Sequence, residues 1–318
     1  MEKRQLGNSG LETAPLAFGG NVFGWTIDEK TSFELLDVFT DAGFDLIDTA
    51  DSYSRWKSGN QGGESETIIG NWMKQRNNRK KIIVATKVGS DMGGNKKGLS
   101  KNYIFQAVED SLKRLQTDYI DVYQSHYDDL SIPVAETIDA YSELIRQGKI
   151  RTFGASNFSV ERLTESLIYS EQNGLPRYQT YQPEYNLYDR EGFEKEYQAI
   201  CVEHGIGVIS YFSLASGFLS GKYRSENDLS KSARGRGIKK YLNERGHLIL
   251  NALDEVAFYY ETTPASISLA WLMAQPAVVA PIASATNTQQ LKELINAAHL
   301  QLDEDTIDLL NKASEYGE

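Results

Sequence analysis

The feature that most constrains the fold of this chain is a regular alternation of short β-prone runs with amphipathic helical stretches. We expect eight strands, at residues 15–18, 44–48, 81–86, 119–125, 150–155, 178–182, 207–211 and 278–282. Helices are expected between and after them, at 31–42, 65–75, 101–115, 133–147, 159–173, 192–204, 245–260 and 288–298. Strands that alternate with helices run parallel, so the pattern predicts an α/β protein.

Eight strand–helix units in about 300 residues fit a closed (β/α)8 barrel, the TIM barrel. The alternative fold is an open doubly wound sheet, which normally carries a GxGxxG turn after its first strand; Gly19, Gly20 and Gly24 have the wrong spacing for it. The segment LGNSGL at 6–11 predicts an N-terminal β-hairpin that closes the barrel bottom, and Asp303 is expected to cap an added C-terminal helix at 303–313. No interdomain linker is evident, so residues 1–318 are expected to form one barrel domain.

Composition excludes several classes of function. The chain has 33 Lys and Arg against 44 Asp and Glu, a net charge of −11, which argues against a nucleic-acid or anionic-membrane partner. A single cysteine, Cys201, and four scattered histidines argue against a disulfide framework and against a metal site. No run approaches the roughly 18 apolar residues of a membrane helix, and the N-terminus does not resemble a signal peptide. We therefore expect a cytoplasmic enzyme.

Four ionisable side chains stand at or just after the ends of three expected strands. Asp48 ends the second strand, and Tyr53 comes five residues later. Lys87 follows the third strand, and His126 follows the fourth. Active sites of such barrels lie at the C-terminal ends of the strands, so these side chains should share one rim. Each alone is more commonly a capping, packing or solvated residue, but the convergence of four favours a catalytic set.

The four side chains suit the protonation of a carbonyl oxygen. A tyrosine has an ordinary pKa of about 10, and a neighbouring lysine ammonium lowers that pKa by favouring the phenolate. Asp48 would keep Lys87 charged and in position, while His126 could donate a hydrogen bond that orients the substrate. This chemistry serves hydride addition, in which the carbonyl oxygen gains negative charge and must be protonated.

The motifs of the chain, in their order, resemble those of the aldo-keto reductases over nearly its whole length. The matching segments are FDLIDTADSY (44–53), GESExxxG (63–70), VATK (84–87), DYIDVYQSH (118–126), GKIRTFGASNF (148–158), QPEYNL (182–187) and SLASGFLSGKY (213–223). The resemblance implies a (β/α)8 barrel with a catalytic tetrad of Asp48, Tyr53, Lys87 and His126. It also implies reduction of a small-molecule aldehyde or ketone to an alcohol by hydride transfer, with Tyr53 as the general acid.

The resemblance further implies a nicotinamide dinucleotide that is bound without a Rossmann domain. The nicotinamide end would be held by Asp48, Ser156, Asn157 and Gln182, with Tyr211 stacked on the ring. Gly20 and Asn21 would line the pocket, and Ser213, Leu214 and Gly217 would cross the pyrophosphate. The adenosine end would meet the helix that begins at Thr288, where Gln290 and Glu293 match polar contacts.

Cofactor choice is where the chain departs from the family pattern. Many members carry an Arg or Lys just after the eighth strand to pair with the 2′-phosphate of NADP, but here that position is Thr286. Lys222 and Arg234 in the long loop match basic positions that clasp the cofactor in some relatives, and Ser284 and Thr286 offer hydroxyl groups. We expect NADP(H) to be preferred over NAD(H), by a smaller margin than in members that have the Arg.

Two other functions remain open from the sequence. A regulatory nicotinamide-binding subunit, as in the beta subunits of potassium channels, would keep the same tetrad. A barrel hydrolase or isomerase would instead need a metal cluster or facing carboxylates. Phe23 and Trp25 are expected to form an apolar wall for the substrate, whose identity the sequence leaves open.

Overall fold

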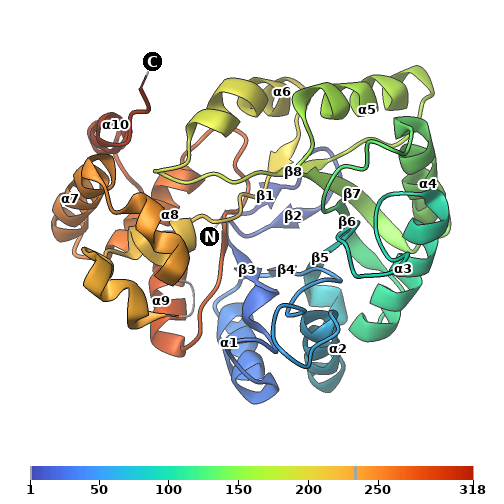
Figure 1. Cartoon of the computed structure of the whole chain (residues 1–318), viewed down its shortest axis with the longest axis horizontal. Helices are drawn as coiled ribbons and strands as arrows, with labels where there is room; N and C mark the ends of the chain where they lie inside the picture. The colour runs from blue at the N-terminus through green and yellow to red at the C-terminus, as the bar shows by residue number, and fades with distance from the viewer. Residues whose placement is uncertain (1, 233–234, 318) are drawn as a thin grey trace.

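The computed structural model describes residues 2–232 and 235–317. Within this part of the chain, eight parallel strands form one curled sheet at the centre, with the α-helices in a ring around it (Figure 1). The strands are β3 (Ala17–Gly19), β4 (Leu46–Asp48), β5 (Ile83–Val88), β6 (Ile120–Ser125), β7 (Ile150–Ser156), β8 (Thr180–Gln182), β9 (Gly207–Val208) and β10 (Ile282–Ala283). Their order is β10-β3-β4-β5-β6-β7-β8-β9, which follows the chain except that the last strand lies beside the first.

The two ends of the sheet meet and close the barrel. The backbone N–H of Val279 donates to the carbonyl oxygen of Val208 at 2.8 Å, and that of Ile282 donates to Ser210 at 2.9 Å. The first bond joins β9 to the segment before β10, and the second joins β10 to the segment after β9, so the predicted (β/α)8 barrel is confirmed.

The predicted N-terminal hairpin is also present. Strands β1 (Arg4–Gln5) and β2 (Glu12–Thr13) pair antiparallel, and Leu6 and Leu11 between them pack on the inner layer of the barrel. Gly7 lies at φ +61°, and a Cβ at this position would collide with the carbonyl oxygen of Gln179. Glycine is therefore required where the turn presses on the barrel floor.

The helices agree closely with the sequence pattern. They are α1 (Glu29–Asp41), α2 (Glu64–Arg76), α3 (Lys101–Leu115), α4 (Val134–Arg146), α5 (Val160–Gln172), α6 (Gln198–Glu203), α7 (Glu244–Tyr259), α8 (Pro264–Met273), α9 (Thr288–Ala297) and α10 (Glu304–Ala313). Asp303 caps α10 as expected, because its carboxylate accepts from the backbone N–H of Thr306 at 2.8 Å.

Four sequence assignments need correction. The sequence pattern missed α8, because nearly every residue of this helix is buried and an all-round apolar helix shows no amphipathic period. The expected helix at 192–204 is a π-helical turn, Phe193–Tyr197, followed by the short α6. The seventh strand ends at Val208 rather than at 211, and the eighth lies at Ile282–Ala283 rather than at 278–282.

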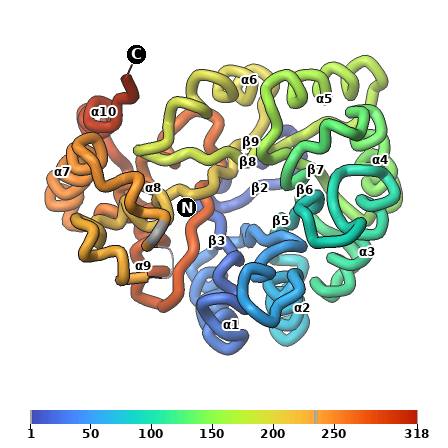
Figure 2. The backbone as a smooth tube through the Cα atoms, in the orientation of Figure 1, coloured from blue at the N-terminus to red at the C-terminus, as the bar shows by residue number. Residues whose placement is uncertain are grey.

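The long irregular segment after β9 contains three short 3-10 helices, η4 (Ala215–Ser220), η5 (Glu226–Lys231) and η6 (Gly235–Tyr241). Contacts join η4 to α8 and to η6, and Figure 2 shows this yellow-to-orange segment beside α8 and α9. It therefore lies over one side of the barrel. No helix in the described part of the chain is long and apolar enough to cross a membrane.

Candidate active site

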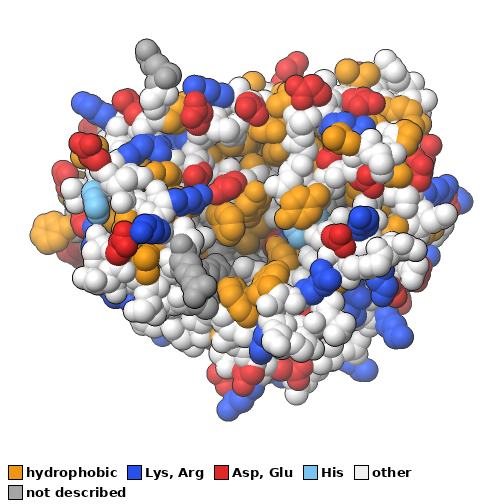
Figure 3. Space-filling view, viewed as in Figure 1, with side chains coloured by type: hydrophobic (Ala, Val, Ile, Leu, Met, Phe, Trp, Pro, Cys, Tyr) orange, Lys and Arg blue, Asp and Glu red, His pale blue; other side chains and the backbone are white. Residues whose placement is uncertain are grey.

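The C-terminal ends of the strands surround a cavity of about 1230 Å³. The face shown in Figure 3 is hollowed near its centre, and hydrophobic side chains gather around the hollow. The cavity extends from the loop after β4, at Tyr53, to the first turns of α9, at Gln290 and Glu293. This position is the one that the barrel rule predicts for an active site.

Strand register brings the predicted catalytic side chains together. Asp48 pairs with Ala85 across β4 and β5, and Lys87 is two residues further along β5. Because side chains alternate along a strand, Ala85 and Lys87 share one face, so Lys87 points toward the end of β4. Lys87 in turn pairs with Gln124 on β6, two residues before His126.

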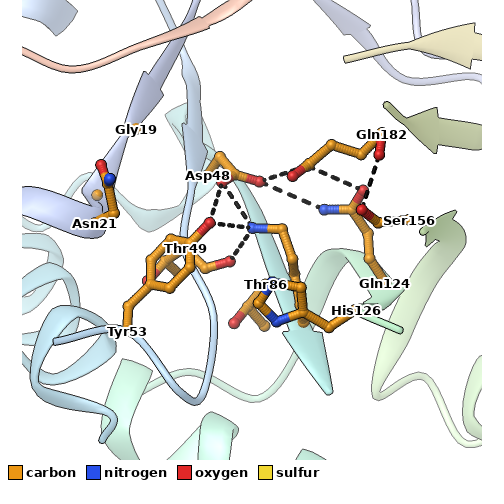
Figure 4. Close-up of polar contacts among 12 residues, drawn as sticks. Gly19, Asn21, Asp48, Thr49, Tyr53, Thr86, Gln124, His126, Ser156 and Gln182 are labelled. Atoms are coloured by element: carbon orange, nitrogen blue, oxygen red, sulfur yellow. Dashed lines mark hydrogen bonds and ion pairs between the residues drawn. The ribbon is translucent and has the colours of Figure 1, made fainter. Parts of the chain in front are cut away.

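Lys87 is the centre of the polar network. Its Nζ donates to Asp48 Oδ2 at 2.7 Å, to the Thr49 carbonyl oxygen at 2.7 Å and to the Tyr53 hydroxyl at 2.9 Å. The Tyr53 hydroxyl itself lies 3.4 Å from Asp48 Oδ2. Figure 4 shows the Tyr53 hydroxyl and the Asp48 carboxylate directed toward each other. Three of the four predicted catalytic residues therefore touch one another.

The second oxygen of Asp48 is fixed by two glutamines. Gln182 Nε2 donates to Asp48 Oδ1 at 2.9 Å, and Gln124 Nε2 lies 3.5 Å from the same atom (Figure 4). Asp48 and Lys87 have almost no solvent exposure, 1% and 0% of their side chains. Such a buried ion pair is tolerated only when its remaining hydrogen-bonding positions are satisfied, which these amides and Thr49 achieve.

The charge of Lys87 is set by two opposing effects. Burial lowers the pKa of Lys87, and the Asp48 carboxylate at 2.7 Å acts in the opposite direction. The Tyr53 phenol therefore faces a cation whose charge depends on its carboxylate partner.

His126 lies at the cavity beside Tyr53. Its ring is 6.0 Å from the Tyr53 ring and stacks on Tyr127 at 4.9 Å, and its Nδ1 is 2.9 Å from Ser90 Oγ. Burial, with a smaller effect from Lys87, holds the pKa of His126 well below its ordinary value. The imidazole is therefore neutral near pH 7, and one nitrogen is engaged by Ser90.

The residues expected at the nicotinamide end lie together at the ends of β7 and β8. Ser156 Oγ donates to the Gln182 carbonyl oxygen at 2.8 Å, and Asn157 Nδ2 donates to the His126 carbonyl oxygen at 2.9 Å. The Tyr211 hydroxyl donates to Asn157 Oδ1 at 3.0 Å. All four of Ser156, Asn157, Gln182 and Tyr211 line the cavity.

The segment after β9 has an unusual backbone. Phe212, Ala215, Ser216 and Gly217 have positive φ angles of 51°, 47°, 59° and 100°. Leu214, at φ −109°, precedes Ala215, and successive backbone N–H groups in such a turn form a concavity that suits an anion. Ser213, Leu214, Gly217 and Lys222 all line the cavity here, as do Lys231 and Ser232, which were not expected from the sequence.

The far end of the cavity is formed by β10 and α9. Ser284 Oγ donates to the Gly19 carbonyl oxygen and lies beside Asn21 Oδ1, both at 2.7 Å. The Thr286 hydroxyl donates to Gln290 Oε1 at 3.0 Å. A residue that contacts a cofactor in this cavity must line it. The cavity is lined here by five of the expected residues, Asn21, Ser284, Thr286, Gln290 and Glu293.

Three expected site residues are placed differently. Gly20 is buried and does not itself line the cavity, and its carbonyl oxygen accepts from Ser65 Oγ at 2.8 Å. Phe23 is buried in the core, with its ring 5.3 Å from that of Phe18. Trp25 packs on Trp56 at 5.5 Å, and neither Phe23 nor Trp25 lines the cavity. A further expected residue, Arg234, lies outside the described residues.

The apolar wall comes from other side chains. Trp56, Tyr127 and Phe212 line the cavity and are each about half exposed, at 51%, 50% and 47%. Gln124 and Ser90 were also not expected from the sequence. Gln124 had a usable signal, because it stands two residues before His126 on β6 and so shares its face.

Comparison with known proteins agrees with this geometry. The profile described as the aldo/keto reductase family matches residues 15–315. The chain belongs to the aldo/keto reductase family. It is 34% identical to an uncharacterized oxidoreductase, YrpG, of Bacillus subtilis, over 98% of this chain and 95% of that relative.

Two other relatives have more specific names. Aldo-keto reductase YhdN of Bacillus subtilis is 34% identical, over 92% of this chain and 88% of the relative. A probable voltage-gated potassium channel subunit beta of Oryza sativa is 32% identical, over 93% of this chain and 91% of the relative. Membership in the aldo/keto reductase family supports an oxidoreductase that acts on small-molecule carbonyl compounds with a nicotinamide cofactor.

Proposed function

We propose that this aldo-keto reductase uses NADP(H) and reduces an aldehyde or ketone to an alcohol, with Tyr53 as the general acid. The proposal is carried by the 2.9 Å contact between Lys87 Nζ and the Tyr53 hydroxyl at the edge of a large cavity. An ammonium at this distance favours the phenolate, so the phenol releases its proton more readily than an isolated tyrosine would. This arrangement suits protonation of an oxygen that gains negative charge.

The chemistry of the cavity fits a nicotinamide dinucleotide. The amides and hydroxyl of Ser156, Asn157 and Gln182 offer partners for a carboxamide, and Tyr211 offers a ring for stacking. The left-handed backbone at 215–217 and the ammonium of Lys222 suit phosphate groups. When bound, the reduced nicotinamide supplies a hydride to the carbonyl carbon.

The side chains of the protein donate the proton, stabilise the resulting phenolate and orient the substrate. Tyr53 gives the proton of its hydroxyl to the carbonyl oxygen, and Lys87 stabilises the phenolate that results. Asp48 holds Lys87 in place at 2.7 Å. His126 is neutral near pH 7, so a Ser90 hydroxyl that donates to Nδ1 leaves the imidazole proton on Nε2, which can orient the substrate oxygen.

We further propose that NADP(H) is preferred by a modest margin. Thr286 replaces the basic residue that many members of the family carry, but Lys222 lines the same cavity and supplies a positive charge. Ser284 and Thr286 add hydroxyl groups near the beginning of α9. Arg234, expected from the sequence to contribute a second charge, remains part of the proposal on sequence grounds alone.

The likeness to the Oryza sativa channel beta subunit supports a second candidate, a regulatory subunit that binds the cofactor but turns over slowly. The two candidates share the tetrad, so the site geometry does not separate them. Turnover does, because a reductase must oxidise the cofactor many times in the presence of a carbonyl compound.

Binding and turnover together test the proposal. Fluorescence quenching gives Kd for NADPH and NADH, and absorbance follows NADPH oxidation against a panel of sugar aldehydes, small aldehydes and cyclic ketones. We expect tighter binding of NADPH and sustained turnover of at least one class. Tighter binding of NADH would overturn the cofactor assignment, and tight binding without turnover of any class would favour the regulatory candidate.

A further inference from the structure

A second group of charged side chains, which includes two buried carboxyl groups, lies near Lys87 and outside the cavity. It consists of Asp51, Glu66 and Arg114, which we call the rear cluster. Glu66 has no exposed surface, and Asp51 is 4% exposed. Neither Asp51 nor Glu66 lines the cavity, so neither is positioned to contact substrate or cofactor directly.

The rear cluster is tied to the strand that carries the catalytic lysine. Thr86, the residue before Lys87, donates from its hydroxyl to Glu66 Oε1 at 2.6 Å. The backbone N–H of Asp51 donates to the carbonyl oxygen of Lys87 at 3.2 Å. The cluster therefore contacts β5 on both sides of the Lys87 side chain and is electrostatically coupled to the Lys87 ammonium.

Among the described residues, one carboxyl group in this region, that of Asp51, has no cationic partner. Lys87 is paired with Asp48, and Arg114 is paired with Glu66 at 2.6 Å. Asp51 forms no ion pair in the described structure, and its Oδ1 is buried without a hydrogen-bond partner there. An isolated buried carboxylate is costly, and such a group normally keeps its proton instead.

The groups that face Asp51 reinforce this conclusion. Burial, and then the negative charge of Glu66, raise the pKa of Asp51 to about 8, against the smaller opposing effects of Arg114, the Ser52 backbone N–H and Lys87. Three tyrosines from the neighbouring elements are also electrostatically coupled to Asp51, and burial raises the pKa of each: Tyr103 on α3, Tyr123 on β6 and Tyr141 on α4. They are neutral phenols and supply no compensating charge.

We propose that Asp51 is a positioning residue that stays protonated at neutral pH and, once ionised, keeps the Lys87–Tyr53 pair protonated to a higher pH. The sign follows from charge alone. Loss of a proton from either Lys87 or Tyr53 makes the buried site more negative, and a carboxylate at Asp51 opposes that loss. The kinetic consequence rests on the proposed reductase function, because reduction requires a protonated Tyr53.

Asp51→Asn tests the proposal, since it keeps the shape of the side chain and removes its ionisation. With saturating NADPH and a reducible carbonyl compound, kcat at pH 6 should match that of the wild type within about twofold, because Asp51 is neutral there in both proteins. The alkaline limb of the pH–kcat profile should shift to lower pH than in the wild type by roughly one unit, because one nearby charge changes a pKa by about this amount. Asp91→Asn, which removes an exposed carboxylate from the loop after β5, is the matched control and should leave the limb in place.

Two kinetic results would overturn the proposal. An equal loss of kcat at every pH in the Asp51→Asn protein would show that Asp51 is only structural. An unshifted alkaline limb would show that the charge of Asp51 does not affect the pKa values of the Lys87–Tyr53 pair.

An NMR titration tests the same claim in the unsubstituted protein without turnover. Aspartate labelled with 13C at the carboxyl carbon should show one resonance that titrates near pH 8, well above the ordinary range for aspartate. If every aspartate resonance titrates below pH 6, the proposal is wrong. Absence of carbonyl turnover would count against the reductase function, whereas this titration decides the protonation of Asp51 in either case.

Discussion

Lys87 has no solvent exposure, and its charge depends on three oxygen atoms. Asp48, Thr49 and Tyr53 each accept a hydrogen bond from its Nζ within 2.9 Å. The carboxylate cancels part of the burial cost, and the carbonyl oxygen of Thr49 satisfies a second proton. The third proton points to the Tyr53 hydroxyl, so the side chain completes the buried network and is placed to lower the pKa of the proposed general acid.

The role of Lys87 predicts a specific pH effect. Lys87→Met removes the cation, so the pKa of Tyr53 should rise. The alkaline limb of the reductase pH–rate profile should therefore shift to higher pH. This direction is opposite to the one expected for Asp51→Asn. The loss in kcat should be at least about 100-fold, the scale of positioned acid–base catalysis.

Circular dichroism and the Kd for NADPH serve as controls for Lys87→Met, because the substitution leaves Asp48 buried without its cation. Folded protein with preserved activity and an unchanged alkaline limb would show that Lys87 is structural and does not tune Tyr53.

At the scale of elements, the sequence was informative where periodicity was clear. The bounds of α3 agree with the expectation, and the N-caps Ser100, Ser159 and Asp303 each accept a backbone hydrogen bond. The pattern failed for α8, whose apolar surface on all sides removes the helical period. The apolar wall was also hard to anticipate, since tertiary packing alone decides that Phe23 is buried and Trp56 exposed.

The loop after β9 carries a prediction about cofactor choice. Lys222 lines the cavity near Gly217, and the proposed preference for NADP(H) assigns its ammonium to the 2′-phosphate. Lys222→Ala should weaken NADPH binding by about 10- to 100-fold, because a charge-assisted hydrogen bond contributes roughly 1.5–3 kcal/mol. Binding of NADH should change by less than about twofold.

The matched control for Lys222→Ala is Lys239→Ala, because Lys239 pairs with Glu226 and does not line the cavity. It should leave both Kd values unchanged. An equal weakening of NADPH and NADH by Lys222→Ala would contradict a contact with the 2′-phosphate.

The N-terminal hairpin carries a prediction about stability. Gly7→Ala places a Cβ against the carbonyl oxygen of Gln179 at a positive φ, so it should lower the free energy of unfolding by about 1–3 kcal/mol. Gly10 also has a positive φ, +73°, but nothing lies within 4 Å of a Cβ there. Gly10→Ala therefore introduces backbone strain without a collision. It should lower the free energy of unfolding by less than Gly7→Ala does. Equal losses in chemical denaturation would show that contact with the barrel floor contributes nothing.

At the scale of the whole molecule, the rule that places active sites at the C-terminal ends of barrel strands is enough to select candidate catalytic residues from the amino-acid sequence. Alternation predicts the barrel, and the strand ends point to Asp48, Lys87 and His126. The rear cluster stayed hidden, because Asp51, Glu66 and Arg114 come from a loop and two helices whose packing no local pattern reveals. That residues 1–318 form one domain, and that Arg234 binds the cofactor, remain predictions.

The central claim, that Tyr53 is the general acid of a carbonyl reductase, is tested most directly by Tyr53→Phe. Only the hydroxyl is removed, so NADPH binding measured by fluorescence quenching should change by less than about twofold. We predict that kcat for carbonyl reduction falls by at least about 100-fold, while Tyr259→Phe, at an exposed position on α7, leaves kcat unchanged. Turnover near the wild-type rate by the Tyr53→Phe protein would contradict this role for Tyr53.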